Sequence, residues 1–267
     1  MQCFKDKIVV ITGAGSGIGR ALALAFAQEG AKLALNDYQT SSLEETQRLL
    51  AQQSAEKVFC SVFDVSNRES VFAFAEAVVA HFGAVDVVIN NAGIAMDSPV
   101  FDQANLNDIE RLIDVNFKGV LYGCKAFIPH LLKRSESALI NVASIFGLTG
   151  IANSEAYCAS KFAVNGLTLS LMQTYRQTNL TVQCVYPGGI KTNIAANAIG
   201  KNPENRNDFE AKFLKRSPES AAETIVKGIK RKNNRILIGG EAHSLDIAVR
   251  VAPIFGCQLV NQRIAPK

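Results

Sequence analysis

The chain has 267 residues, of which 48% are hydrophobic and 19% are charged, and its formal net charge is +4. This length suits one large α/β domain that can bury most of its apolar surface. Because the net charge is small and the lysines and arginines are scattered, nucleic acid is not expected as a partner.

Short apolar runs alternate with helical segments along the whole chain. Strands are predicted at 7–13, 32–37, 57–63, 85–90, 138–143, 180–186 and 235–239, and helices at 17–29, 41–53, 67–82, 104–131, 155–177 and 218–231. Near-continuous apolar strands joined by helical crossovers indicate a parallel sheet covered on both faces. The predicted fold is therefore α/β, a Rossmann-type doubly wound seven-stranded parallel sheet in a single domain.

A glycine-rich turn joins the first strand to the first helix, with the sequence Thr12-Gly13-Ala14-Gly15-Ser16-Gly17-Ile18-Gly19. Its spacing, T-G-x-x-x-G-x-G, departs from the common G-x-G-x-x-G fingerprint, but the strand–turn–helix setting is the same. Glycines there let the backbone approach a pyrophosphate, which the helix N-terminus stabilises. The turn predicts a dinucleotide site that includes Gly13, Ser16, Gly17, Ile18 and Gly19.

A carboxylate at Asp37 ends the second predicted strand. In this position it can accept hydrogen bonds from the ribose hydroxyls of an adenosine. A 2′-phosphate in the same place would meet a like charge, which can cost several kcal/mol. The next residue, Tyr38, brings no positive charge to offset that repulsion, so the sequence favours NAD over NADP.

Three side chains from the middle of the chain can converge on one carbonyl group. Tyr157 and Lys161 are four residues apart and so share one face of a helix. Ser144 follows a predicted strand, at the edge where open α/β sheets place their ligands. The ordinary pKa of tyrosine is about 10, and an ammonium together with a bound cofactor charge can lower it toward about 7, which takes about 4 kcal/mol. Tyr157 is thus a candidate general acid or base.

With these motifs the chain resembles the classical short-chain dehydrogenase/reductase family over roughly residues 5 to 240. The resemblance also includes Asn90-Asn91-Ala92-Gly93 after one strand, Asn116 in a helix, and Pro187-Gly188-Gly189-Ile190-Lys191-Thr192 after another strand. It implies that Tyr157 exchanges the proton and that Ser144 holds the carbonyl or alkoxide oxygen. Lys161 would also bind the nicotinamide ribose, and Asn116 would order a water that connects this lysine to solvent.

The resemblance assigns further contacts to the cofactor. Asp64 and Val65 match the family's acidic position after the third strand and are expected beside the adenine. Ser16 stands where many NADP-using relatives carry arginine or lysine, which again favours NAD. The other expected cofactor-binding residues are Asn91, Ala92, Gly93, Tyr157, Lys161, Pro187, Gly188, Ile190 and Thr192.

The leading functional prediction is an NAD-dependent oxidoreductase that interconverts a secondary alcohol and a ketone. An NADPH-dependent 3-ketoacyl carrier reductase is the alternative enzyme, which Asp37 disfavours. A non-catalytic dinucleotide-sensing protein is the alternative from another class, which the retained Tyr157 and Lys161 disfavour. His81, His130 and His243 lack metal-ligand spacing, and the resemblance implies catalysis without a metal.

Residues 1–240 are predicted to form the catalytic domain, with a substrate lid at 189–217, and residues 241–267 a C-terminal extension. A lipophilic substrate, long-chain or steroid-like, is predicted if the following apolar side chains close the pocket: Ile190, Ile194, Ile199, Phe209, Phe213, Leu214, Leu245 and Phe255. The alternative is that these side chains only fill the core or a subunit interface. The extension is too short and interrupted to span a bilayer. It could pack on a neighbouring subunit, roof the pocket or touch a membrane surface.

Assembly and location are also open to prediction. The resemblance implies a homodimer or homotetramer formed through the predicted helices 104–131 and 155–177, together with the last strand and the tail. The six cysteines include no C-x-x-C pair, and no apolar segment precedes the first strand. These features favour a reducing, cytoplasmic location.

Overall fold

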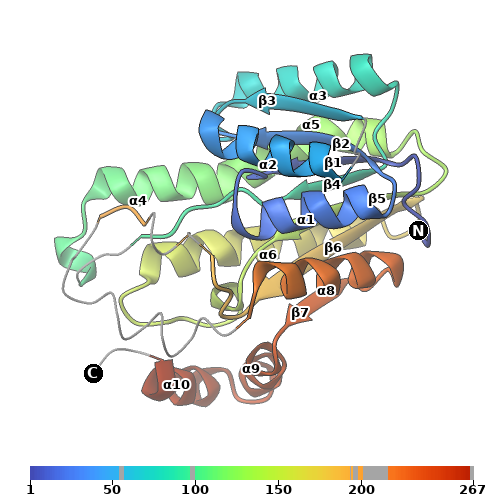
Figure 1. The fold of residues 1–267 in the computed structure, drawn as a ribbon. Coiled ribbons are helices and arrows are strands. Elements are labelled where there is room, and N and C mark those ends of the chain that lie inside the picture. Colours follow the sequence, from blue (N-terminus) through green and yellow to red (C-terminus); the bar gives the residue numbers. More distant parts are fainter. Residues whose placement is uncertain (54–56, 97–99, 193, 195–197, 201–215, 265–267) are drawn as a thin grey trace.

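The computed structural model describes residues 1–53, 57–96, 100–192, 194, 198–200 and 216–264. Its centre is one sheet of seven strands in the order β3-β2-β1-β4-β5-β6-β7 (Figure 1). Every neighbouring pair of strands is parallel. The strand order runs outward in opposite directions from β1 and β4, so the chain changes direction at the middle of the sheet. This topology confirms the predicted doubly wound α/β fold.

The seven predicted strands are all present, with bounds close to those expected. They are β1 (Ile8–Thr12), β2 (Lys32–Asp37), β3 (Val58–Val62), β4 (Val87–Asn90), β5 (Ser137–Val142), β6 (Leu180–Pro187) and β7 (Arg235–Ile238). The helices are α1 (Gly17–Gln28), α2 (Thr40–Gln52), α3 (Arg68–Phe82), α4 (Leu106–Ile113), α5 (Gly119–Leu131), α6 (Glu155–Thr174), α8 (Pro218–Lys230), α9 (Gly240–Val251) and α10 (Pro253–Ile264). Three short helical turns are η1 (Phe101–Gln103), η2 (Asp114–Lys118) and η3 (Ile145–Gly147).

The alternation of side chains along β1 explains why both faces of the sheet are covered. Val9 and Ile11 are buried in one core cluster with Phe26 of α1. Val10, on the other side of the strand, is buried in a second cluster with Phe127 of α5. Since successive residues of a strand point to opposite faces, an unbroken apolar run requires two helical layers.

Two segments differ from the sequence-based prediction. The helix expected over 104–131 is divided into α4 and α5 by η2, a π-helical turn that contains Asn116. The C-terminal extension, for which no secondary structure was predicted, forms α9 and α10. Figure 1 shows these two helices beside β7 and below the sheet.

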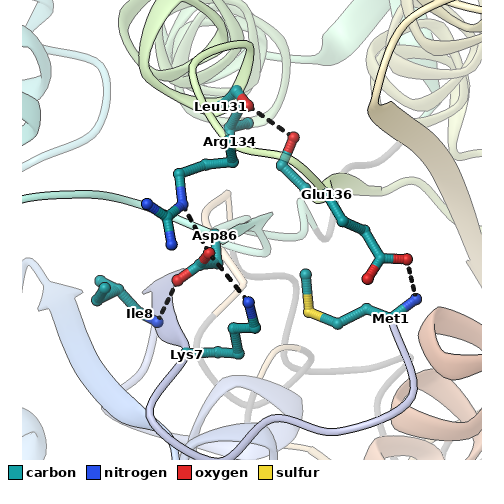
Figure 2. A network of polar contacts seen from close by, with 8 residues as sticks. Met1, Lys7, Ile8, Asp86, Leu131, Arg134 and Glu136 are labelled. Carbon is teal, nitrogen blue, oxygen red and sulfur yellow. Dashed lines mark hydrogen bonds and ion pairs between the residues drawn. The ribbon is translucent and has the colours of Figure 1, made fainter.

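A buried carboxylate closes the end of the sheet where β1 and β4 begin (Figure 2). Asp86 is 1% exposed. Its Oδ2 accepts a hydrogen bond from the Ile8 backbone at 3.0 Å, and its Oδ1 accepts one from Arg134 Nε at 2.8 Å and lies 3.6 Å from Lys7 Nζ. Because Asp86 is paired with two cations and a backbone N–H, its charge is compensated despite burial. The contacts of Asp86 therefore stabilise this end of the sheet, which is opposite the end that carries the predicted site.

Candidate active site

A cleft of about 380 Å³ lies at the carboxyl ends of the strands. The predicted residues that line it come from the turns after β1 to β6 and from α6: Gly13, Ser16, Gly17, Ile18, Asp37, Asp64, Val65, Asn91, Ala92, Gly93, Ser144, Tyr157, Lys161, Pro187, Gly188, Ile190 and Thr192. Their assembly follows from topology, since parallel strands present their carboxyl ends at one edge. The two other predicted residues, Gly19 and Asn116, lie just behind the lining.

The glycine-rich turn has no room for side chains at Gly13 and Gly19. Gly13 and Gly17 have φ values of +65° and +51°, which favour glycine over other residues. A Cβ on Gly13 would lie 2.8 Å from Ala92 Cα, and one on Gly19 would lie 2.0 Å from the Gly13 carbonyl oxygen. These contacts bring the start of α1 tightly against the strand ends.

The N-terminus of α1 opens into the same cleft. Ser16 is its N-cap, makes no side-chain capping bond, and is followed by a first turn without acidic residues. Ser16, Gly17 and Ile18 line the cleft. The free N–H groups and the helix dipole of such a terminus attract an anion. The turn therefore fits the pyrophosphate of a dinucleotide.

Asp37 is held at the end of β2 by the backbone. Its Oδ2 accepts from the Gly15 N–H at 2.8 Å and its Oδ1 from the Gln39 N–H at 3.0 Å. A Cβ on Gly15 would lie 2.7 Å from the Asp37 Cγ, so Gly15 is needed for this contact. The carboxylate is 8% exposed and keeps lone pairs for ligand hydroxyls on the cleft side. Because the backbone holds this negative charge at the cleft, it would repel a 2′-phosphate, which supports the expected preference for NAD.

Arg111 of α4 lines the cleft and was missed by the sequence analysis. Its guanidinium donates to Asp64, and its Nη1 donates to Ser66 Oγ at 2.7 Å. Ser66 donates twice to Asp64 Oδ1, from its N–H at 2.9 Å and its hydroxyl at 2.7 Å. Burial acts to raise the pKa of Asp64, but the bonds from Arg111 and Ser66 outweigh it and hold that pKa below its usual value. No local spacing marks Arg111, because the partner carboxylate is 47 residues away in sequence.

Ser144, Tyr157 and Lys161 meet on one wall of the cleft. Ser144 follows β5 as the N-cap of η3, is 8% exposed, and its hydroxyl oxygen accepts from the Phe146 N–H at 3.2 Å. It lies close enough to Tyr157 to act against the rise of that tyrosine's pKa. Lys161 Nζ lies 5.7 Å from the centre of the Tyr157 ring and donates to the Val142 carbonyl at 3.2 Å. The structure thus brings together the serine, the tyrosine and the lysine as predicted.

The protein groups alone do not lower the pKa of Tyr157. Burial raises the pKa of Tyr157 to about 12, against a smaller opposite effect of the Ser144 side chain. Burial also lowers the pKa of Lys161 to about 8. A pKa of about 7 for Tyr157 was expected from the Lys161 ammonium together with the charge of a bound cofactor. Within the protein, desolvation of the ring outweighs an ammonium that lies beyond direct contact.

Asn116 binds the backbone of Ile94 and the side chain of Ser160, the residue before Lys161. Its side-chain amide donates to the Ile94 carbonyl at 2.9 Å and accepts from the Ile94 N–H at 2.8 Å. It also donates to Ser160 Oγ at 3.2 Å. A Cβ on Gly93 would lie 3.1 Å from Asn116 Oδ1 and 3.4 Å from Lys161 Nζ. The π turn that carries Asn116 therefore fixes the floor of the site, and π turns are frequent at functional sites.

The remaining lining is mainly apolar. Ile190, Ile194 and Ile199, all expected at the pocket, line the cleft together with Ile94 and Val142. Leu245 and Phe255 do not: Leu245 is buried in a separate cluster with Ile145, and Phe255 is 66% exposed. Phe209, Phe213 and Leu214 fall outside the described residues. A small second hollow also borders Tyr157 and includes Met96 and Phe101.

Across the described residues, no helix combines the length and the apolar character that crossing a membrane requires. In the same part of the chain, no group of three or more His, Cys, Asp or Glu side chains is arranged to hold a metal ion.

Comparison with known proteins gives one consistent result. A family model described as short chain dehydrogenase matches residues 7–202. A Mycobacterium tuberculosis protein named as the oxidoreductase SadH is 46% identical over 94% of this chain and 92% of its own. The crystal structure of a short-chain dehydrogenase/reductase from Burkholderia phymatum in complex with NAD is 28% identical, covers 96% of both chains and has a TM-score of 0.86. An alcohol dehydrogenase from the archaeon Thermococcus sibiricus, complexed with 5-hydroxy-NADP, is 28% identical over 88% of this chain and 96% of its own, with a TM-score of 0.76.

Proposed function

Because the chain belongs to the short-chain dehydrogenase family and is an oxidoreductase of that family, we propose that it interconverts a lipophilic secondary alcohol and the corresponding ketone with NAD. The observation that carries this proposal is the meeting of Ser144, Tyr157 and Lys161 in the cleft that also holds the glycine-rich turn. One cleft can therefore hold a dinucleotide and a carbonyl compound together.

The fit of the cleft supports the cofactor assignment. When bound, the nicotinamide ring takes up or gives the hydride. The N-terminus of α1 would receive the pyrophosphate, Asp37 would accept hydrogen bonds from the adenosine ribose, and Asp64 and Val65 would contact the adenine. Lys161 would hold the nicotinamide ribose, and Asn91, Ala92, Gly93 and residues 187–192 would border the nicotinamide half.

The protein groups then divide the proton chemistry among them. During alcohol oxidation the Tyr157 phenolate accepts the hydroxyl proton, and during ketone reduction the phenol returns it. The Ser144 hydroxyl donates to the substrate oxygen as negative charge grows on it. The positive charge of Lys161 favours the phenolate, and together with the charge of a bound cofactor it would act against the effect of burial on the pKa of Tyr157.

The lipophilic substrate is supported by the apolar wall of Ile94, Ile190, Ile194 and Ile199. At about 25 cal/mol per Å² of buried apolar area, each methylene that reaches this wall adds roughly 0.8 kcal/mol of binding. We therefore expect kcat/KM with NAD to rise from short secondary alcohols to long-chain or polycyclic ones. A series of alcohols, followed by the absorbance of reduced nicotinamide, tests this. Highest activity on a small polyol would contradict the lipophilic assignment and leave the dehydrogenase assignment standing.

The preference for NAD is expected to depend on Asp37. Asp37→Ala should weaken NAD binding by about tenfold, since hydrogen bonds to a charged group contribute about 1.5–3 kcal/mol, and should strengthen NADP binding by removing the repulsion. Asp37→Asn, which keeps an acceptor but no charge, should lose less NAD affinity than Asp37→Ala. Calorimetric titration of both cofactors measures these effects. Tighter binding of NADP than NAD to the unchanged protein would contradict the assignment and favour the 3-ketoacyl carrier reductase.

The proposal extends to the oligomeric state and the cellular location of the protein. Exposed apolar side chains on α5 and α6, namely Leu121, Phe162 and Leu169, support a homodimer or homotetramer formed through these helices. Light scattering that gives only a monomer at micromolar concentration would reject it. All six cysteines are free thiols, which supports a reducing cytoplasmic environment.

A further inference from the structure

One side chain of the C-terminal helix α10 binds the loop that leads into the catalytic helix. Asn261 Oδ1 accepts from the Ala152 N–H at 2.8 Å, and its Nδ2 donates to the Gly150 carbonyl at 2.8 Å and to the Cys257 carbonyl at 2.9 Å. The opposite amide orientation would place Oδ1 against two carbonyl oxygens and the NH₂ group against an N–H. The contacts therefore fix the amide in one orientation, bridging two points of the loop.

The loop in question, residues 148–154, connects η3 to α6 and so lies between Ser144 and Tyr157 in the chain. Side chains hold much of its backbone. Besides Asn261, the Cys257 thiol donates to the Gly150 carbonyl at 3.2 Å, and Cys158 Sγ accepts from the Ile151 N–H at 3.4 Å. A loop that relies on side-chain partners is sensitive to the loss of any one of them.

The helix that supplies Asn261 is itself firmly placed. In α9, Asp246 accepts two hydrogen bonds from Arg235 of β7, both at 2.7 Å. Leu245 of α9 is buried against Ile145 of η3, and Val260 of α10 packs on the same cluster. The extension is thus anchored to the sheet and to the turn that follows Ser144, and it can act as a fixed support for the loop.

We infer that Asn261 is a positioning residue for catalysis: it clamps residues 150–152 and so sets the place of Tyr157 relative to Ser144. This inference rests on the proposed function, because it concerns proton transfer at Tyr157. The clamp does not touch the cofactor cleft, as none of the described residues of 241–264 lines it. Loss of the clamp should therefore affect turnover and leave cofactor binding in place.

The kinetic test compares Asn261→Leu with Gln262→Leu, the same substitution at the neighbouring, exposed position. Asn261→Leu should lower kcat for alcohol oxidation by about tenfold, since small misplacements of catalytic groups are costly. The Kd of NAD should stay within about twofold of the unchanged protein. The pH profile of kcat should move to higher pH, because a displaced Tyr157 loses part of the stabilisation of its phenolate. Gln262→Leu should match the unchanged protein.

A second variant and a measurement without substrate keep the inference testable if Asn261→Leu folds poorly or if no alcohol is turned over. Asn261→Asp keeps the acceptor for Ala152 but puts a carboxylate oxygen in place of the donor to Gly150, so it should also lower kcat even if Asn261→Leu folds poorly. Hydrogen exchange of the Ala152 amide reports the clamp without any substrate, and it should be at least about tenfold faster in Asn261→Leu. Unchanged exchange would overturn the clamp, even if the protein turned over no alcohol at all. Faster exchange with unchanged kcat and pH profile would overturn the positioning role.

Discussion

Tyr157→Phe is expected to lower kcat by about a thousandfold while the Kd of NAD stays within about twofold of the unchanged protein. The substitution removes the proton-transferring oxygen and keeps the ring that packs 5.7 Å from Phe146, centre to centre. General acid–base catalysis typically contributes a factor of about 10² to 10⁴, which sets the size of the loss. Initial rates of alcohol oxidation and calorimetric titration with NAD measure the two quantities separately.

A matched control for this experiment lies on the same helix. Tyr175 is the C-cap of α6, outside the residues that line the cleft. Tyr175→Phe removes an identical hydroxyl group and should leave kcat within about twofold. If Tyr157→Phe kept activity within tenfold of the unchanged protein, Tyr157 would not be the proton donor and acceptor.

Lys161→Met is expected to abolish turnover and yet to stabilise the cofactor-free protein at neutral pH. Lys161 is 3% exposed, and burial lowers its pKa from the ordinary 10.5 to about 8. At about 1.4 kcal/mol per pH unit, this difference corresponds to roughly 3 kcal/mol of strain from holding a buried ammonium. A methionine of similar length fills the same space without a charge. Urea unfolding of both proteins near pH 7 measures the difference.

The expected stability difference between Lys161→Met and the unchanged protein depends on pH in a definite direction. Below about pH 8 the folded protein must keep Lys161 charged, so the destabilisation is fully present there. As the pH rises from about 8 toward 10.5, the folded protein releases the proton while the unfolded chain still holds it. The stability of the unchanged protein therefore rises across this window, and the advantage of Lys161→Met shrinks.

The exposed Lys125 of α5 provides the control, because Lys125→Met removes an equal charge from the surface and should change the free energy of unfolding little. If the Lys161→Met protein were less stable than the unchanged protein at neutral pH, the predicted destabilisation by a buried ammonium would be contradicted. A stability difference that stays constant from neutral to alkaline pH would contradict it as well. The expected combination, greater stability with lost activity, is typical of groups retained for function.

The strands and the cleft could be predicted from the sequence for one physical reason. Runs such as Ile8–Thr12 are apolar on both faces because helices cover both faces of a parallel sheet. Once the sheet is parallel, the residues after each strand must gather at one edge. Ser144 and Asp37, distant in sequence, thus fall in the same cleft.

The features that could not be predicted depend on contacts between distant residues. The π turn at Asp114–Lys118 holds Asn116 against Ile94, 22 residues away, and Arg111 finds its partner 47 residues away. The two helices of the extension were not predicted either, and the place of α9 is set by the Asp246–Arg235 pair. The pKa of Tyr157 depends on burial, which no local spacing reveals.

If this cleft oxidises secondary alcohols with NAD, a hydride must pass from the carbinol carbon of the alcohol to the cofactor. The most direct measurement uses a long-chain secondary alcohol with deuterium on that carbon and follows the label by mass spectrometry of the recovered cofactor. Deuterium should appear in reduced NAD with the unchanged protein and be reduced to background with Tyr157→Phe. Cofactor that stays oxidised and unlabelled with every secondary alcohol tested, while NAD binds to the cleft, would contradict the proposed dehydrogenase function and favour a non-catalytic dinucleotide-binding role.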